Sequence, residues 1–298
     1  MPKVMILGVA GMLGNVLFRE LSASGEYDVW GSARSTDSLR TVVPDALLGR
    51  ILPDVDATDV LAVRRLLDES RPDVVVNAIG VIKQDPRVQN LGNTVAVNAL
   101  FPHLLAEHCA EIGARLIHVS TDCVFSGESG KYTERSQPDP HDFYGMSKLL
   151  GEVVSPALVL RTSIIGHELA GNRSLIDWFL SRSGTVRGFT RAIYSGVTTT
   201  EFARLLSTVV IPRPQLSGLL HVAAEPISKH DLLTLVAKQY RWDGQIVPDD
   251  SFVCDRSLVA DHLQTLTGYR PPDWPTMIRA MYESSPYSRI EDAGLVDA

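Results

Sequence analysis

The sequence has few of the residues and patterns that mark disulfide-bonded, metal-binding or membrane proteins. It contains three cysteines, Cys109, Cys123 and Cys254, whose odd number and spacing fit neither a disulfide framework nor a metal site. Reduced thiols in the cytoplasm are the simplest interpretation. No apolar stretch is long enough to span a bilayer, and the first residues do not resemble a signal peptide. We therefore expect no bound metal and no membrane partner.

Strong charge of one sign is also absent. The net charge of −7 is spread along the chain, and no basic run alternates with aromatic residues, so we expect no nucleic-acid partner. The sequence has no internal repeat and no low-complexity segment. Its 298 residues, 45% of them hydrophobic, suit one large α/β domain or a nucleotide-binding domain with a smaller cap.

Two short segments carry the most information about chemistry. Residues 120–125 read Ser-Thr-Asp-Cys-Val-Phe, and residues 144–148 read Tyr-Gly-Met-Ser-Lys. On a helix, Tyr144 and Lys148 lie one turn apart on the same face. A nearby ammonium lowers the pKa of a phenol, and such a phenol can exchange a proton with an oxygen that the Thr121 hydroxyl holds in place. These residues predict reversible carbonyl reduction, and the alternative for Tyr144 is an amphipathic core tyrosine.

The N-terminus indicates where a hydride comes from. Apolar residues 3–7 predict a buried strand, followed by the turn Gly-Val-Ala-Gly-Met-Leu-Gly at 8–14 and a helix at 15–21. In this context a glycine motif indicates dinucleotide binding rather than a purely structural turn. The first glycine permits a tight turn, the second lets backbone approach a pyrophosphate, and the third allows close helix packing. The helix N-terminus offers N–H donors to the phosphates.

Strand-like and helix-like segments alternate through the first half of the chain. We expect strands at 27–33, 73–78, 115–120 and 157–160, and helices at 59–70, 94–112 and 144–154. This alternation predicts an α/β fold with a doubly wound parallel sheet. Ligands of such sheets bind beyond the carboxyl ends of the strands, where the glycine turn, residues 77–80 and residues 120–122 all fall.

Beyond residue 163 the pattern loosens, and Gly, Pro and Thr become frequent. We expect a cofactor-binding Rossmann domain at 1–163 and a smaller C-terminal substrate-binding lobe, mainly 164–298. A helix at 201–210 and a strand at 219–222 interrupt this lobe and return to the main sheet. Residues from about 201 to 222 therefore belong with the first domain.

The motifs together resemble the extended short-chain dehydrogenase/reductases. They are Gly-x-x-Gly-x-x-Gly, Asn-Ala-x-Gly, Ser-Thr-Asp-x-Val-Phe and Tyr-Gly-x-Ser-Lys, and they are most similar to those of the dTDP-4-dehydrorhamnose reductase-like sugar-nucleotide reductases. Residues 161–166 and 268–274 extend the likeness over nearly the whole chain. It implies a catalytic triad of Thr121, Tyr144 and Lys148. Tyr144 would protonate the alkoxide as hydride arrives, while Lys148 would lower its pKa and bind the nicotinamide ribose.

The resemblance also implies a cofactor site along the carboxyl edge of the sheet. Its residues are Gly8, Gly11, Met12, Leu13, Gly14, Ser32, Arg34, Val55, Asp56, Asn77, Ala78, Ile79, Gly80, Asn98, Tyr144, Lys148 and Thr162. NAD enzymes commonly have an acid at the end of the second strand, but this chain has Arg34, and a guanidinium suits a 2′-phosphate. NADP(H) is preferred and NAD(H) is the alternative, since Arg34 also fits a solvated loop. Asp56 either lies near the adenine or caps the helix that begins near Asp59.

The same resemblance places a nucleotide-sugar substrate against a second set of residues. They are Lys83, Asp122, Cys123, Val124, Asn172, Trp178, Arg191 and Tyr194. Arginine and asparagine suit pyrophosphate recognition, and an aromatic ring stacks on a base or sugar. Trp178 also fits a helix core, and Arg191 also fits a surface charge.

The pair Asp122-Cys123 bears on the type of reaction. Sugar-nucleotide dehydratases tend to carry Asp-Glu after the threonine, so the cysteine here disfavours dehydration. GDP-fucose synthase, a related epimerase–reductase, has a cysteine near this place, paired with a histidine. Residues 172–175 contain no histidine, and His167 is displaced. Cys123 is therefore a packing residue, an epimerase base or a substrate contact.

The predicted function is NADPH-dependent reduction of a keto group, at C4, of a nucleotide-linked deoxysugar. The product would enter a polysaccharide or a glycosylated metabolite. Two alternatives stay open: an epimerase–reductase that uses Cys123, and a non-catalytic NADP-binding regulatory subunit, which a resemblance to the methionine adenosyltransferase regulatory subunit permits. A homodimer is compatible with either.

Overall fold

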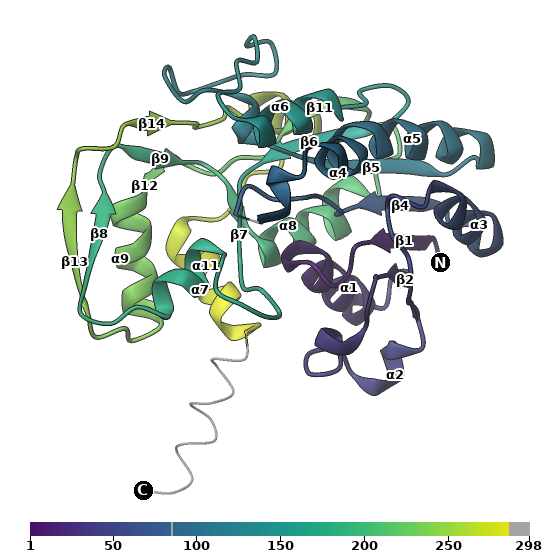
Figure 1. The fold of residues 1–298 in the computed structure, drawn as a ribbon, viewed down its shortest axis with the longest axis horizontal. Helices are drawn as coiled ribbons and strands as arrows, with labels where there is room; N and C mark the ends of the chain where they lie inside the picture. The colour runs from purple at the N-terminus through teal and green to yellow at the C-terminus, as the bar shows by residue number, and fades with distance from the viewer. Residues whose placement is uncertain (85, 286–298) are drawn as a thin grey trace, which may run out of the picture.

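A seven-stranded sheet forms the centre of the computed structural model, which describes residues 1–84 and 86–285 (Figure 1). Its strand order is β11-β6-β5-β4-β1-β2-β3, and every pair is parallel. The strands are β1 Lys3–Leu7, β2 Asp28–Ser32, β3 Ile51–Leu52, β4 Val74–Asn77, β5 Arg115–Thr121, β6 Leu158–Thr162 and β11 Gly218–His221. The order reverses between β1 and β4, which makes that edge the expected ligand crevice. The predicted doubly wound α/β fold is confirmed.

Alternate residues of the central strands supply two separate cores. In β1, Val4 and Ile6 belong to one apolar cluster, while Met5 and Leu7 belong to the other. All four side chains are fully buried, because helices cover both faces of the sheet. An unbroken apolar run such as residues 3–7 is therefore what a central parallel strand requires.

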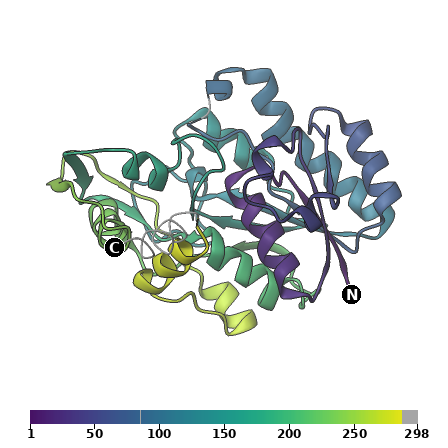
Figure 2. The ribbon, with the colours of Figure 1, turned by 90° about the horizontal axis from the view of Figure 1, so that it is seen from below.

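Helices pack on both faces of this sheet. One face carries α1 (Met12–Ser24) and α8 (Thr199–Leu205), which lie side by side in Figure 2, and the other carries α3 (Val60–Ser70) and α5 (Phe101–Ile112). The chain enters α5 through α4 (Leu91–Thr94) and a π-helical segment, Val95–Leu100. The helix expected at 94–112 thus starts three residues earlier, where Asn90 caps it.

The helix that carries Tyr144 and Lys148 is shorter than expected. It is α6, Phe143–Leu150, and it ends at Gly151 rather than at residue 154. The close approach of the Asn98 carbonyl leaves no room for a Cβ at Gly151, so this glycine marks both the helix end and a packing contact. Short helical turns complete this part of the chain. They are η1 Asp37–Leu39, α2 Asp45–Leu48, η2 Pro86–Gln89 and η4 Asp122–Val124.

A smaller lobe, left of the main sheet in Figure 1, follows β6. Its strands are β7 Ile164–Ile165, β8 Thr185–Phe189, β9 Ala192–Tyr194, β10 Val197–Thr198, β12 Ile227–Ser228, β13 Gln245–Asp249 and β14 Cys254–Asp255. Its helices are α7 Leu175–Leu180, α9 Lys229–Gln239, α10 Asp261–Thr267 and α11 Trp274–Glu283. Residues 286–298 of the expected lobe lie outside the described residues.

The chain between two parts of this lobe lies in the main sheet. Helix α8, continued by a π-helical turn at Leu206–Val210, packs against α1, and β11 pairs with β6. Phe202, Leu205 and Leu206 join the same core as Val4 and Ile6. One apolar core therefore continues from the sheet into the smaller lobe.

The described residues contain neither a membrane-crossing helix nor a metal-binding cluster. None of the helices there is both long and apolar enough to cross a membrane. No group of three or more His, Cys, Asp or Glu side chains within residues 1–84 and 86–285 is arranged to hold a metal ion.

Candidate active site

The loop after β5 and the start of α6 pack directly against each other. Thr121 ends β5, and its Oγ1 accepts a hydrogen bond from Cys123 N at 3.1 Å, which fixes the following turn. The Asp142 carboxylate caps α6 by accepting from Gly145 N at 2.8 Å. A Cβ at Gly145 would collide with the Cys123 carbonyl, so only glycine permits this approach. The contact brings Tyr144 to Thr121.

Tyr144 is a half-buried phenol that keeps its proton. Burial raises its pKa above the ordinary value, neighbouring Cys123 adds to the increase, and the hydrogen bond with the Thr121 side chain opposes it. The expected lowering of this pKa by Lys148 is therefore not seen. A neutral phenol is nevertheless the form that donates a proton during carbonyl reduction.

Lys148 is held at the end of β5 instead of against the phenol. Its Nζ donates to the Val119 carbonyl at 2.8 Å. Burial lowers the pKa of Lys148 to about 8, and the Glu152 carboxylate raises it in part. Glu152 is itself fixed by a buried bidentate ion pair with Arg161, at 2.7 and 2.6 Å. The ammonium is therefore charged at neutral pH in a fixed position.

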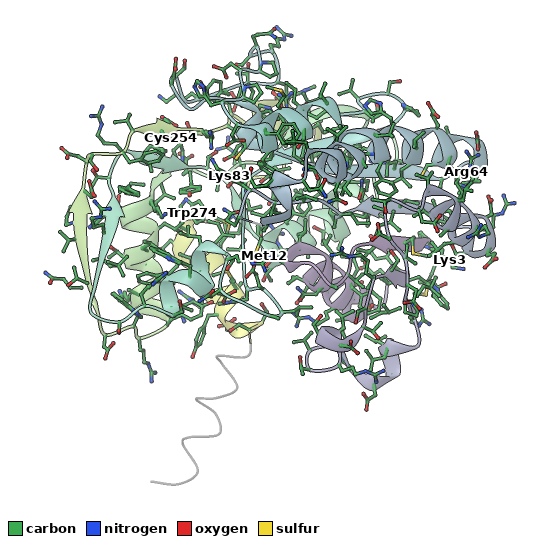
Figure 3. The ribbon with its side chains drawn as sticks, in the orientation of Figure 1. Lys3, Met12, Arg64, Lys83, Cys254 and Trp274 are labelled. Carbon is green, nitrogen blue, oxygen red and sulfur yellow. The ribbon has the colours of Figure 1, made fainter. Side chains whose placement is uncertain are left out.

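The glycine turn has the geometry of a phosphate cradle. Gly8 has φ of +90°, and a Cβ at Gly14 would collide with the Gly8 carbonyl, so both positions require glycine. Helix α1 starts at Gly11 with no side-chain cap and no acidic residue in its first turn. Its first N–H groups are consequently open to an anion. Met12 lies at this point, on the side of the sheet facing the smaller lobe (Figure 3).

The end of β2 adjoins this turn. The Ser32 carbonyl accepts from Gly8 N and Val9 N, both at 3.0 Å, and Arg34 follows as an exposed side chain. Val55 is buried, and Asp56 accepts from the Thr58 backbone and hydroxyl. Asp59, not Asp56, caps α3, so the capping interpretation of Asp56 is wrong.

Three predicted cofactor residues use their polar atoms inside the protein. The Asn98 side chain bonds to both Val81 backbone groups and to Ser147 Oγ. The buried Asn77 accepts from Ile79 N and contacts the His118 ring, and its placement orients the Ala78–Gly80 backbone. Thr162 is buried and donates to the Ser163 carbonyl. The side chains of Asn77 and Asn98 therefore shape the loop after β4.

The predicted substrate residues fall into two groups, of which the first surrounds Thr121 and Tyr144. Burial raises the pKa of Tyr194 to about 12, and the charges of Asp122 and Cys123 add to this shift, so the three side chains are neighbours. Lys83 pairs with Asp142 at 2.7 Å and lies between the main sheet and the smaller lobe (Figure 3). Val124 is fully buried in a small apolar cluster.

The second group consists of Trp178, Asn172 and Arg191. Trp178 packs on the core of the smaller lobe, with Arg182 and Lys229 over its ring at 5.3 and 5.4 Å, which favours the helix-core interpretation over a substrate contact. Asn172 is exposed and donates weakly to Ser181 Oγ at 3.4 Å. The Arg191 side chain is exposed.

Cys123 does not have the surroundings of an acid–base cysteine. Burial raises the pKa of its thiol to about 12, and the charge of Asp122 adds to the increase. The displaced His167 is occupied elsewhere, with its ring nitrogens 2.6 Å from Asp177 and 2.7 Å from the Tyr240 hydroxyl. Cys123 is therefore a neutral thiol without a histidine partner.

Arg256 is a site residue that the sequence interpretation missed. Its Nη1 lies 3.5 Å from Cys123 Sγ, and its Nε donates to the Phe125 carbonyl at 2.8 Å. The arginine and the cysteine are 133 positions apart, and Arg256 lies in no recognised motif. No local pattern of the sequence signals this contact.

Comparison with known proteins agrees with this arrangement. A probable low-salt glycan biosynthesis reductase, Agl14, of Haloferax volcanii is 32% identical over 86% of this chain and 84% of its own. A dTDP-4-dehydrorhamnose reductase of Aggregatibacter actinomycetemcomitans is 27% identical over 76% of this chain and 74% of its own. The Bacillus anthracis dTDP-4-dehydrorhamnose reductase, solved with NADP, has the same fold, with a TM-score of 0.78, 20% identity, and coverage of 96% of this chain and 100% of that one.

The family model described as RmlD substrate binding domain matches residues 2–284. The match spans both the main sheet and the smaller lobe, so it does not rest on the glycine turn alone. It also confirms the resemblance found from the motifs. The chain belongs to the RmlD substrate binding domain family, among the extended short-chain dehydrogenase/reductase-like proteins.

Proposed function

We propose that this protein is an NADPH-dependent reductase of the 4-keto group of a nucleotide-linked deoxysugar, acting in deoxysugar or polysaccharide biosynthesis. The observation that carries the proposal is the close packing of Gly145 on the Cys123 carbonyl, which sets the neutral phenol of Tyr144 beside Thr121 at the carboxyl edge of the sheet. Two relatives named as reductases, one of a 4-dehydro sugar nucleotide and one of glycan biosynthesis, support the substrate class.

The cofactor would bind along the glycine turn. The uncapped N-terminus of α1 suits the pyrophosphate, and the exposed Arg34 beyond β2 suits a 2′-phosphate, which favours NADPH over NADH. When bound, NADPH supplies the hydride. We assign cofactor binding to residues 1–163 and about 201–222. We assign sugar-nucleotide binding mainly to the other residues from 164 onward.

The residues of the chain handle the oxygen of the reacting carbonyl. The Thr121 and Tyr144 side chains are neighbours, so one substrate oxygen can contact both hydroxyls. Thr121 orients that oxygen, and Tyr144 gives its proton to the alkoxide as the carbon is reduced. The Lys148 ammonium, held at the Val119 carbonyl, lies on the same face of α6 as Tyr144 and would bind the nicotinamide ribose.

The surroundings of Cys123 argue against an epimerase–reductase. An epimerase base must remove a proton from a ring carbon, and the half-buried Cys123 thiol, with its pKa raised to about 12, is a poor base at neutral pH. A regulatory subunit would need cofactor binding alone, without the Thr121–Tyr144 pair.

We place the reaction in the cytoplasm, since Cys109, Cys123 and Cys254 are all free thiols. A homodimer is compatible with this proposal.

The test is NADPH oxidation with 4-keto-6-deoxy sugars on dTDP, UDP, GDP and CDP carriers. We expect turnover with at least one of them, with NADPH used faster than NADH. Tight NADPH binding without turnover of any sugar in the panel would refute a reductase and favour the regulatory subunit. Deuterium uptake from solvent at a ring carbon other than C4 would identify an epimerase.

A further inference from the structure

The smaller lobe extends an arginine to the loop that follows Thr121. Arg256 comes directly after β14, which pairs in parallel with β9, with Asp255 opposite Ile193. One step further in this register places Arg256 beside Tyr194. Asp255 N also donates to the Gly127 carbonyl at 2.7 Å, and a Cβ at Gly127 would meet Cys254 Sγ. The segment is therefore fixed against the loop that continues from Thr121.

The Arg256 guanidinium is held on two sides only. Its Nε donates to the Phe125 carbonyl, and its Nη1 contacts the neutral Cys123 thiol. Among residues 1–84 and 86–285, Nη2 has no hydrogen-bond partner and no carboxylate lies within ion-pair distance of this side chain. Arg256 is partly buried, so its charge is only partly solvated. Burial lowers the pKa of Arg256, but the neighbouring Cys123, Cys254, Asp122 and Asp142 outweigh it and the pKa is raised, so the side chain stays charged with Nη2 available to a ligand.

Electrostatics put the same guanidinium close to the reacting centre. The Arg256 charge acts on Asp122 and Cys123, and the charges of these two groups act in turn on Tyr144. Asp122 is a buried carboxylate that does not bond to the arginine. The two groups thus offer a donor and an acceptor on the same side of the site, an arrangement that suits a hydroxyl group.

The chemistry of the proposed substrate identifies that hydroxyl. In a 4-keto-6-deoxy sugar, C5 carries a methyl group and the ring oxygen, whereas C3 carries a hydroxyl. A sugar whose C4 oxygen contacts Thr121 and Tyr144 has C3 or C5 beside the loop at Asp122 and Cys123, and of the substituents on these two carbons only the C3 hydroxyl both donates and accepts a hydrogen bond. Arg256 lies directly behind Cys123.

We infer that Arg256 is a specificity-determining residue, whose free Nη2 donates to the C3 hydroxyl of a 4-keto-6-deoxy sugar. This inference rests on the proposed function. It predicts that the protein discriminates against sugars that lack an oxygen at C3, since the guanidinium and Asp122 are then both left without a partner.

The test compares wild type with Arg256→Gln by calorimetric binding of dTDP-L-rhamnose, its 3-deoxy analogue and dTDP alone. Glutamine keeps an N–H group that can donate to the Phe125 carbonyl, so the contact between the lobes is retained. Arg187→Gln is the matched control, since Arg187 is exposed on β8 of the same lobe, where it pairs with Asp249 and lies over the Phe189 ring. We expect Arg256→Gln to weaken dTDP-L-rhamnose binding by about tenfold to a hundredfold, and to leave dTDP and the 3-deoxy analogue within about twofold. Arg187→Gln is expected to change none of the three.

Two results overturn the inference. Equal binding of dTDP-L-rhamnose by wild type and Arg256→Gln would remove the contact, and equal weakening of all three ligands would make Arg256 a structural clamp or a diphosphate ligand. If Arg256→Gln melts far below wild type, the binding test is repeated with Arg256→Lys. This variant keeps the charge and should retain part of the preference for dTDP-L-rhamnose over its 3-deoxy analogue. Wild type that binds none of the sugar nucleotides and reduces no 4-keto sugar refutes the proposed function itself.

Discussion

The Lys83 ammonium and the Asp142 carboxylate lie 2.7 Å apart and join the loop after β4 to the first turn of α6. The other oxygen of Asp142 caps that helix through Gly145 N. One carboxylate thus positions the helix of Tyr144 and Lys148 and holds a lysine that we expect to contact the substrate. Burial raises the pKa of Asp142, but the hydrogen bonds from Lys83 and Gly145 N outweigh it and the pKa is lowered.

The cap and the ion pair of Asp142 are separable by mutation. Asp142→Ala removes both and should lower the free energy of unfolding by about 1 kcal/mol, whereas Asp142→Asn keeps the cap and should cost only a few tenths of a kcal/mol. The ion pair contributes little because about half of the Lys83 side chain is exposed. Urea unfolding at neutral pH measures both variants. If asparagine is as destabilising as alanine, the ion pair rather than the cap fixes α6.

The phenol of Tyr144 should be required for turnover and not for the fold. Tyr144→Phe removes the proton donor, so kcat is expected to fall by about a hundredfold or more, while the Kd of NADPH changes little. Tyr27→Phe is the matched control, because Tyr27 loses a buried hydrogen bond to the Ser207 carbonyl, far along the sequence from the site. Steady-state kinetics and fluorescence titration with NADPH give the two readouts. Full activity of Tyr144→Phe would exclude the mechanism.

The charge of Lys148 should set the alkaline limit of activity. Its pKa is lowered to about 8 by burial, so the ammonium is lost as pH rises through that value. The kcat/KM for reduction should fall about tenfold per pH unit well above pH 8. Lys148→Arg stays charged, and its residual activity should be level from pH 7 to 9.5. A wild-type profile that is flat to pH 10 would show that this charge is not needed.

The same lowered pKa also predicts how stability depends on pH. Below about pH 8 the folded protein carries a buried ammonium, which burial disfavours, whereas the unfolded chain titrates near pH 10.4. The unfolded state therefore binds more protons between these values, and this residue's contribution to stability rises with pH across them. The unfolding free energies of wild type and Lys148→Met are measured at pH 7.5 and at pH 10. The stability of wild type relative to Lys148→Met should be greater at pH 10 than at pH 7.5. No shift would mean that the pKa of Lys148 is not lowered by folding.

Arg34 should select between the two cofactors. Arg34→Ala removes a guanidinium that we expect to bind the 2′-phosphate, so the Kd of NADPH should rise about tenfold while that of NADH stays within about twofold. Arg40→Ala, at another exposed arginine that follows β2, is the control and should affect neither. Equal weakening of both cofactors by Arg34→Ala would assign the arginine to another part of the dinucleotide.

Local patterns predicted the fold well because they reflect local physics. An apolar run at residues 3–7 must be buried on both faces, and glycines at 8 and 14 are needed where backbone and helix approach closely. The spacing of Tyr144 and Lys148 follows from the helical repeat. Helix ends were less predictable, since Gly151 ends α6 through a contact with the Asn98 carbonyl, from a distant segment.

The roles of individual site residues were predicted less well. Asn98 was expected to contact the cofactor, yet its amide is fully used by Val81 and Ser147. The sequence around Trp178 was compatible with a core residue and with a substrate contact. Its packing on the core of the smaller lobe favours the core residue. Motif matching assigns a residue to a site without showing which neighbours already occupy its polar atoms.

The sequence by itself determined the doubly wound sheet and the tight glycine turn, and it predicted the roles of Thr121, Tyr144 and Lys148, because those features depend on residues close together in the chain. Only the tertiary structure decided the electrostatics of the site. Burial raises the pKa of Tyr144 where a nearby lysine was expected to lower it, and Lys148 donates to Val119. The structure also brings Arg256 to Cys123 across 133 positions, because pairing of β14 with β9 carries it there. Solvent exclusion and contacts between distant segments are properties of the folded chain, so no local pattern encodes them.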